Sequence, residues 1–198
     1  MLRNLIFAWS ATLTDDRGPA LGPTSPVLLP HAWQFLHFCQ MTSRRMFLLS
    51  QIEQPLFVEQ SARLGVAHFF ERVYFRTTDR PARIAEIVTE NGLAPHETAF
   101  VGDTVGEMEM AQDGGLVVIA TLTGLDSRVS LSRTKADVLV RDLGELQRLL
   151  EAVPPNDEIR VVELELMARV GVTAEERAHS QRLTVSITLQ SPHSFSGL

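Results

Sequence analysis

Short, uniformly apolar runs alternate with helical patterns over the first 150 or so residues of the chain. Apolar runs at 5–9, 46–49 and 99–101 are typical of strands that are buried on both faces of a parallel sheet. Apolar residues recur at helical spacing in the segments 31–41, 56–64, 82–91, 105–112 and 143–153, several of which are followed by glycine. This succession predicts an α/β fold with a doubly wound parallel sheet.

The pattern changes at the sequence Pro154-Pro155-Asn156-Asp157, which we interpret as a domain boundary between residues 1–153 and 154–198. Beyond it, 159–166 and 183–189 alternate apolar and polar residues, as amphipathic strands do. One predicted apolar face carries Val162, Leu164 and Leu166, and the other strand contributes Leu183, Val185, Ile187 and Leu189. We expect an antiparallel β-hairpin whose open edges favour a homo-oligomer joined through these strands.

Composition and charge exclude several classes of function. The chain has 198 residues, is 44% hydrophobic and 21% charged, and carries a net charge of -6. This acidic balance argues against nucleic acid as a partner. No apolar run approaches the length of a membrane span, and no secretory signal precedes the first strand. The single cysteine, Cys39, fits a core position in a reducing compartment, so we expect a cytoplasmic protein.

Two carboxylates follow the apolar run that ends at Val101. Asp103 stands at the predicted carboxyl end of this strand, and Glu107 lies one turn into the helix that follows. In open α/β sheets this end of the strands faces the ligand crevice, and a pair of carboxylates suits Mg²⁺. The alternative is that Asp103 only caps the helix.

The segment Val101–Gly115 resembles the fourth motif of the haloacid dehalogenase superfamily of phosphatases, in which Gly-Asp and a second acidic residue hold the catalytic Mg²⁺. The resemblance covers residues 1 to about 152 in motif order. At the first motif, however, Ala8 stands at the position of the nucleophilic aspartate, Ser10 at that of the general acid/base, and Ala11 at that of a glycine. The resemblance therefore implies a Mg²⁺ site that is weak or absent, and a chain that has lost the covalent route.

The remaining motifs of the superfamily have counterparts in this chain. Ser50, after the strand 46–49, matches the hydroxyl residue that binds the phosphoryl group, although a serine ending a strand means little alone. Arg80 matches the family's lysine, with a solvated arginine as the alternative. Asp15 and Asp16 are better interpreted as turn residues than as substitute catalytic groups. The short spacing between the first two motifs implies that there is no large cap domain.

A second resemblance concerns the predicted loop 169–181 and the strand after it. They resemble the N-terminal part of dihydroneopterin aldolase, in which Glu176 matches a glutamate near the pterin site. The chain stops at Leu198, before the segments that carry that family's catalytic lysine, which implies a truncated or partial aldolase module of the tunnelling fold. The alternative is that Glu175, Glu176 and Arg177 form a charged turn of an interaction hairpin.

Together, the resemblances lead to two hypotheses. The first is a phosphatase-type domain for small phosphate esters, among them a pterin phosphate of folate biosynthesis, fused to an aldolase-like module and catalytically impaired. The second is a non-catalytic protein that binds phosphorylated metabolites or assembles through its C-terminal strands. Ala8 and Ser10 favour the second hypothesis, whereas Ser50, Arg80, Asp103 and Glu107 keep a phosphate site in view.

Overall fold

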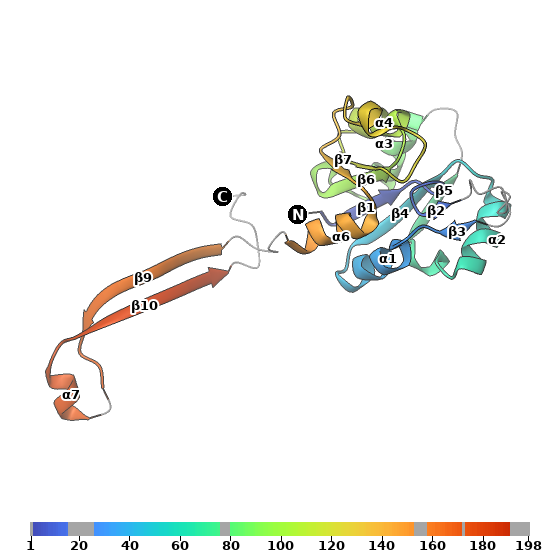
Figure 1. The fold of residues 1–198 in the computed structure, drawn as a ribbon. Helices are drawn as coiled ribbons and strands as arrows, with labels where there is room; N and C mark the ends of the chain where they lie inside the picture. The colour runs from blue at the N-terminus through green and yellow to red at the C-terminus, as the bar shows by residue number, and fades with distance from the viewer. Residues whose placement is uncertain (1, 16–25, 76–79, 153–157, 172, 191–198) are drawn as a thin grey trace. The chain divides into compact units, whose positions relative to one another are not determined.

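The computed structural model describes residues 2–15, 26–75, 80–152, 158–171 and 173–190 (Figure 1). Contacts between Cα atoms divide the chain into two compact units, Met1–Glu151 and Ala152–Leu198.

A parallel β-sheet forms the centre of the first unit. Its strands are β1 (Asn4–Phe7), β4 (Arg45–Ser50), β5 (Arg72–Phe75), β6 (Thr98–Gly102), β7 (Val117–Thr121) and β8 (Val138–Val140). They lie in the order β5-β4-β1-β6-β7-β8, and every neighbouring pair is parallel. The predicted α/β fold with a doubly wound parallel sheet is confirmed.

Helices cover both faces of this sheet (Figure 1). One face packs against α1 (Ala32–Met41), α2 (Gln54–Leu64) and α6 (Leu143–Ala152), and the other against α3 (Arg80–Glu90), α4 (Val105–Asp113) and the short α5 (Arg128–Leu131). Successive residues of a strand point to opposite faces. Leu5 and Phe7 therefore join the first apolar cluster, whereas Ile6 joins the second. Burial on both faces explains why the interior positions of these strands are apolar.

The described part of the connection between β1 and α1 contains two short strands. These strands, β2 (Thr14–Asp15) and β3 (Val27–Leu28), pair antiparallel. Further along the chain, 3₁₀ turns occur after α2 at η1 (Ala67–Phe69) and after α3 at η2 (Pro95–Glu97). Asp15 lies in β2, whereas Asp16 lies outside the described residues.

The buried side of α1 includes Cys39, while Phe38 is only half-buried. Phe38 packs against the same apolar cluster as Cys39. Burial raises the pKa of the Cys39 thiol to about 12, against a smaller lowering by Arg44. Trp33, on the same helix, is 46% exposed and stacks on His37 with ring centroids 5.2 Å apart.

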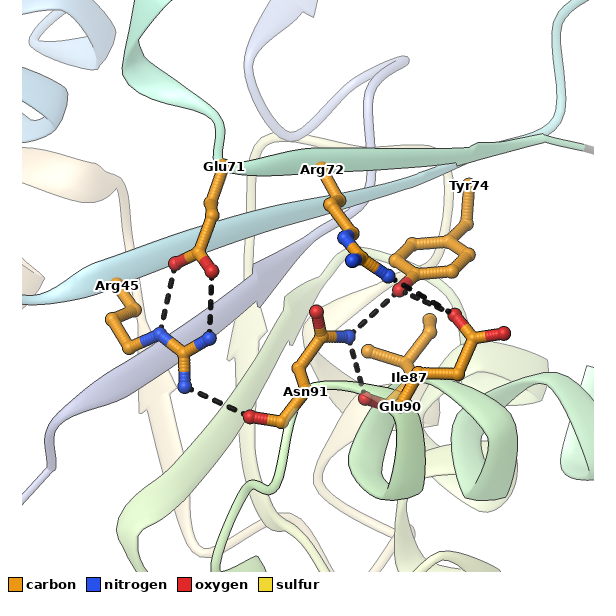
Figure 2. A network of polar contacts seen from close by, with 7 residues as sticks. All are labelled: Arg45, Glu71, Arg72, Tyr74, Ile87, Glu90 and Asn91. Carbon is orange, nitrogen blue, oxygen red and sulfur yellow. Dashed lines mark hydrogen bonds and ion pairs between the residues drawn. The ribbon is translucent and has the colours of Figure 1, made fainter.

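A polar network joins the amino ends of β4 and β5 to the end of α3 (Figure 2). Arg45 forms a bidentate pair with Glu71, with N–O distances of 2.8 and 2.7 Å, and donates a third hydrogen bond to the carbonyl of Asn91 at 3.0 Å. The Asn91 amide donates to the Tyr74 hydroxyl, which in turn donates to Glu90. These contacts lie at the edge of the sheet opposite the strands' carboxyl ends.

The second unit contains a long β-hairpin. Strands β9 (Glu158–Ala168) and β10 (Gln181–Gln190) pair antiparallel, and the helix α7 (Ala174–Ala178), which the sequence pattern did not predict, lies in the loop between them. The register shifts between Val185 and Ile187, so that Val185 pairs with Leu164 but Ile187 pairs with Val161. This β-bulge corrects the predicted face, because Val161 rather than Val162 lies opposite Ile187.

Within the described ranges, no helix has both the length and the apolar character that crossing a membrane requires.

Candidate functional site at the carboxyl ends of the strands

The candidate residues gather because of the strand order. β1 lies between β4 and β6, and all three run parallel, so their carboxyl ends meet at one edge of the sheet. Ser10, Ser50 and Asp103 occur at or just beyond these three ends. The chain also changes direction across the sheet at β1, since β4 lies on one side and β6 on the other, and such a switch point is where open α/β sheets bind ligands.

Ala8 extends β1 into the sheet end without bringing any reactive group. Its backbone N–H donates to the Val101 carbonyl at 3.0 Å, and the residue is 3% exposed. Its methyl group belongs to the apolar cluster that includes Ile6, Leu49 and Ala120. A methyl group can neither attack phosphorus nor bind a cation.

The loop after β1 has the backbone shape that a glycine would favour. Ala11 has φ 59°, in the left-handed region, although it is not a glycine. Its N–H donates to the Thr14 carbonyl at 2.7 Å, and its own carbonyl accepts a hydrogen bond of 2.6 Å from Thr123 Oγ1. The surrounding hydrogen bonds therefore hold a conformation that costs an alanine about 1–2 kcal/mol.

Asp103 is buried at the centre of the site, with 3% of its surface exposed. Its Oδ1 accepts a hydrogen bond of 3.0 Å from the hydroxyl of Thr12, which is completely buried. Gly124 lies against the other oxygen, because a Cβ added to this glycine would come within 1.8 Å of Oδ2. The carboxylate thus contacts both the loop after β1 and the loop after β7.

Glu107 turns back onto the start of its own helix. Its Oε2 accepts hydrogen bonds from the backbone N–H groups of Asp103 and Thr104, at 3.2 and 3.3 Å. With the Thr104 side chain accepting from the N–H of Glu107, the two residues form a capping box. Burial, and secondarily the charge of Asp103, raise the pKa of Glu107, although the hydrogen bonds to its carboxylate oppose this.

The remaining predicted residues differ in how far the structure describes them. Ser50 ends β4, is completely buried, and accepts a hydrogen bond of 3.2 Å from the Ile52 N–H. Ser10 is half-buried and forms an isolated bridge with Thr14. Arg80 is the first residue of α3, and its side chain lies outside the described part of the structure. The assigned roles of these residues remain predictions.

The loop after β7 is the part of the site that sequence reasoning missed. Thr123 bonds to Ala11, Gly124 packs against Asp103, and Asp126 Oδ2 accepts from the first N–H of α4, that of Val105, at 2.7 Å. The signal was a Thr-Leu-Thr-Gly run directly after a buried strand. Without the strand order, however, nothing connected it to Asp103.

The donor set does not fit a tightly held Mg²⁺ ion. Position 8 supplies no ligand, Asp103 Oδ1 accepts from Thr12, and Glu107 Oε2 accepts from two backbone N–H groups. Among the residues that the structure describes, no three His, Cys, Asp or Glu side chains come together in a group that could hold a metal ion.

The fold agrees with that of solved hydrolases. A haloacid dehalogenase-like family hydrolase from Streptococcus pneumoniae matches with a TM-score of 0.67, at 15% identity over 75% of this chain and 98% of that one. The L-2-haloacid dehalogenase from Xanthobacter autotrophicus matches with a TM-score of 0.60, at 15% identity over 78% of this chain and 100% of its own. The chain has the haloacid dehalogenase-like fold.

A protein from Clostridium difficile assigned as a phosphatase also shares this haloacid dehalogenase-like fold, with a TM-score of 0.68 and 12% identity over 75% of this chain and 98% of that chain. No protein-family model matches the sequence, and a search of curated proteins finds no significant match. At these identities the likeness concerns the fold alone, and the chemistry has to be argued from the residues of the site.

The candidate pterin residue belongs to the second unit. Glu176 lies in α7, and its side chain is outside the described part of the structure. A concavity of about 500 Å³ is lined by Glu165, Leu166, Met167 and Arg182, of which Glu165 and Arg182 pair with each other at 2.5 Å. This concavity offers a ligand little beyond an ion pair that is already formed, and the aldolase resemblance of the segment remains a prediction.

Proposed function

We propose that the first unit binds a small phosphate ester at the carboxyl ends of its strands and does not hydrolyse it through a phosphoenzyme. The observation that carries this proposal is Ala8, whose buried methyl group stands where the resemblance places the nucleophile. A covalent intermediate needs a nucleophilic oxygen at that position, and the loss of one removes the route.

Ser50 supports the binding part of the proposal. Its hydroxyl oxygen accepts from the Ile52 N–H, and its own proton has no acceptor among the described residues. A buried hydroxyl with an unused proton is ready to donate to a ligand oxygen, because leaving a buried donor unpaired costs free energy. Arg80, at the start of α3, would add the positive charge that a phosphate requires.

The class of ester is a finer proposal and rests on the second unit. The resemblance of residues 169–181 to dihydroneopterin aldolase suggests a pterin phosphate, since an adjacent aldolase-like module would act on the dephosphorylated product. Only the sequence of this loop supports the pterin, with Glu176 as the candidate contact.

Assembly through the second unit is the other candidate function. Leu164, Leu166 and Ile187 are 41%, 39% and 40% exposed, and the hairpin register places them on paired positions of one sheet face. Apolar side chains grouped on a two-stranded sheet favour association with another surface, which supports a homo-oligomer formed through these strands.

Calorimetric titration with a panel of small phosphate esters, including a pterin phosphate, tests the binding. We expect measurable affinity for at least one ester and a clear loss of affinity in Ser50→Ala. Ser61→Ala is the matched control, because Ser61 is also buried but bonds within its own helix to the Val58 carbonyl. Hydrolysis of p-nitrophenyl phosphate by the unaltered protein at ordinary enzyme rates would contradict the proposal.

A further inference from the structure

Asp103 connects three segments of the site, which is more than capping a helix would require. It receives the hydroxyl of Thr12 from the loop after β1, lies directly after β6, and has Gly124 of the loop after β7 packed against it. The loops after β1 and β7 are also joined to each other by the hydrogen bond from Thr123 to the carbonyl of Ala11. All three segments lie at the carboxyl ends of parallel strands of one sheet.

We propose that Asp103 accepts the hydrogen bond from the Thr12 hydroxyl instead of binding a divalent cation, so that the site at the strand ends binds its ligand without a metal. Asp103 is then a positioning residue, which holds three loops in place as a hydrogen-bond acceptor. This inference relies on the proposed function only for the statement that a phosphate ester binds at this edge.

The geometry leaves little of Asp103 for a cation. Oδ1 accepts from a donor that is itself completely buried, and the approach to Oδ2 is restricted by the backbone of Gly124. Glu107 offers no substitute, because its Oε2 serves the N–H groups at the start of α4. Mg²⁺ gives up its water reluctantly and requires near-ideal octahedral geometry, which a pair of already bonded carboxylates does not provide.

Removing the charge at position 103 should change phosphate affinity in opposite directions depending on whether a cation is bound. If a cation bridged Asp103 and the phosphate, removing the carboxylate charge would weaken phosphate binding. Without a cation, the carboxylate and the phosphate repel each other, so that Asp103→Asn should strengthen phosphate binding severalfold. The asparagine retains Oδ1 as the acceptor for Thr12 and therefore keeps the tie between the loops.

The experiment measures two quantities in the full chain, the melting temperature and the affinity for inorganic phosphate, each with millimolar Mg²⁺ and with EDTA. We expect neither quantity to respond to the choice of Mg²⁺ or EDTA in the unaltered protein. Asp103→Asn should melt close to the unaltered protein and bind phosphate more tightly. Asp103→Ala and Thr12→Val should both melt several degrees lower, because each removes the buried hydrogen bond between Thr12 and Asp103, whereas Thr12→Ser keeps the hydroxyl and should restore the melting temperature.

Two results would overturn the inference. One is a phosphate affinity that falls in EDTA or in Asp103→Asn, as a metal ligand requires. The other is a Thr12→Val variant that melts with the unaltered protein, which would show that the hydrogen bond holds nothing in place. If the unaltered protein does not bind phosphate under either condition, the proposed function fails, and the melting series with Mg²⁺ and EDTA still decides whether Asp103 acts as an acceptor or as a metal ligand.

Discussion

Replacing Ala8 by aspartate restores the missing nucleophile and at the same time tests how apolar the strand end is. Ala8 is 3% exposed and packs in the cluster with Ile6 and Leu49. A carboxylate introduced here loses its hydration and lies near Asp103, and both effects raise its pKa. We therefore expect Ala8→Asp to be folded but much less stable than the unaltered chain at neutral pH.

The magnitude follows from the burial. A fully buried carboxyl group has its pKa raised by up to about 3–5 units, and each unit corresponds to about 1.36 kcal/mol. Because position 8 lies at the end of a strand, we expect roughly half of this maximum, about 2–3.5 kcal/mol. For a domain of about 150 residues this lowers the melting temperature by roughly 4–14 °C. It is a large fraction of a total stability of about 5–15 kcal/mol.

The assay is thermal unfolding of Ala8→Asp against Ala8→Asn over a range of pH. The asparagine has the same size without the charge, so the difference between the two variants isolates the cost of ionisation. The pKa of the new carboxyl group in the folded protein is raised above its unfolded value of about 3.9. The stability of Ala8→Asp is therefore retained at low pH and falls as the pH rises through the folded pKa. The melting curves of the two variants should therefore converge near pH 4 and separate toward pH 7.

The same variant addresses catalysis. With Mg²⁺ present, the new carboxylate would supply both a nucleophile and a cation ligand that position 8 lacks, and hydrolysis of p-nitrophenyl phosphate should appear in Ala8→Asp or only after Ser10→Asp and Ala11→Gly are added. If Ala8→Asp and Ala8→Asn melt together at every pH, the strand end is open to water, and the reasoning from the apolar cluster is refuted.

Four other predictions concern separate parts of the chain. Mg²⁺ should bind the unaltered protein only weakly in a calorimetric titration, and a micromolar affinity in the absence of phosphate would contradict the absence of a fitting donor set. Truncation after Val153 should leave a folded and more monomeric first unit by light scattering, whereas a monomeric full chain with a far less stable truncation would contradict assembly through the hairpin. Cys39, with its pKa raised to about 12 by burial, should react with a thiol reagent at pH 8 only after unfolding, and rapid labelling of the native protein would be evidence against a closed core. The hydrogen bonds from Arg45 lower the pKa of Glu71. The pair should therefore stabilise the fold at pH values above the ordinary pKa of a glutamate, and this stabilisation should be lost as the pH falls through the lowered pKa. Because both side chains are partly exposed, Glu71→Gln should cost less than about 1 kcal/mol in denaturant unfolding at neutral pH.

The sequence was sufficient for the fold of the first unit because its signals are strong and local. Runs that are apolar on both faces identify parallel strands, and the glycines at 65 and 92 end helices with positive φ of 69° and 60°. The helix predicted over 105–112 is observed as Val105–Asp113. Patterns of this kind are decided by burial and backbone geometry within a few residues.

Contacts between distant segments could not be predicted in this way. The hydrogen bond between Thr12 and Asp103 joins residues 91 positions apart, and the packing of Gly124 against Asp103 depends on β7 lying beside β6. In the hairpin, the apolar pattern changes phase between Val161 and Val162, and both phases are consistent with a strand. Only the pairing with β10 shows that a bulge absorbs the extra residue.

The two tryptophans give the first unit two independent optical reporters. Trp9 is 2% exposed, donates its indole N–H to Gln60 at 2.8 Å, and packs edge-on against Phe57. Trp33 is about half exposed to solvent and stacks on the imidazole of His37. Fluorescence from Trp9 therefore follows the integrity of the loop after β1, next to the candidate site, while that from Trp33 follows the outer surface of α1. Replacing Trp33 by phenylalanine would leave a single emitter whose spectrum responds to events at the ends of the strands.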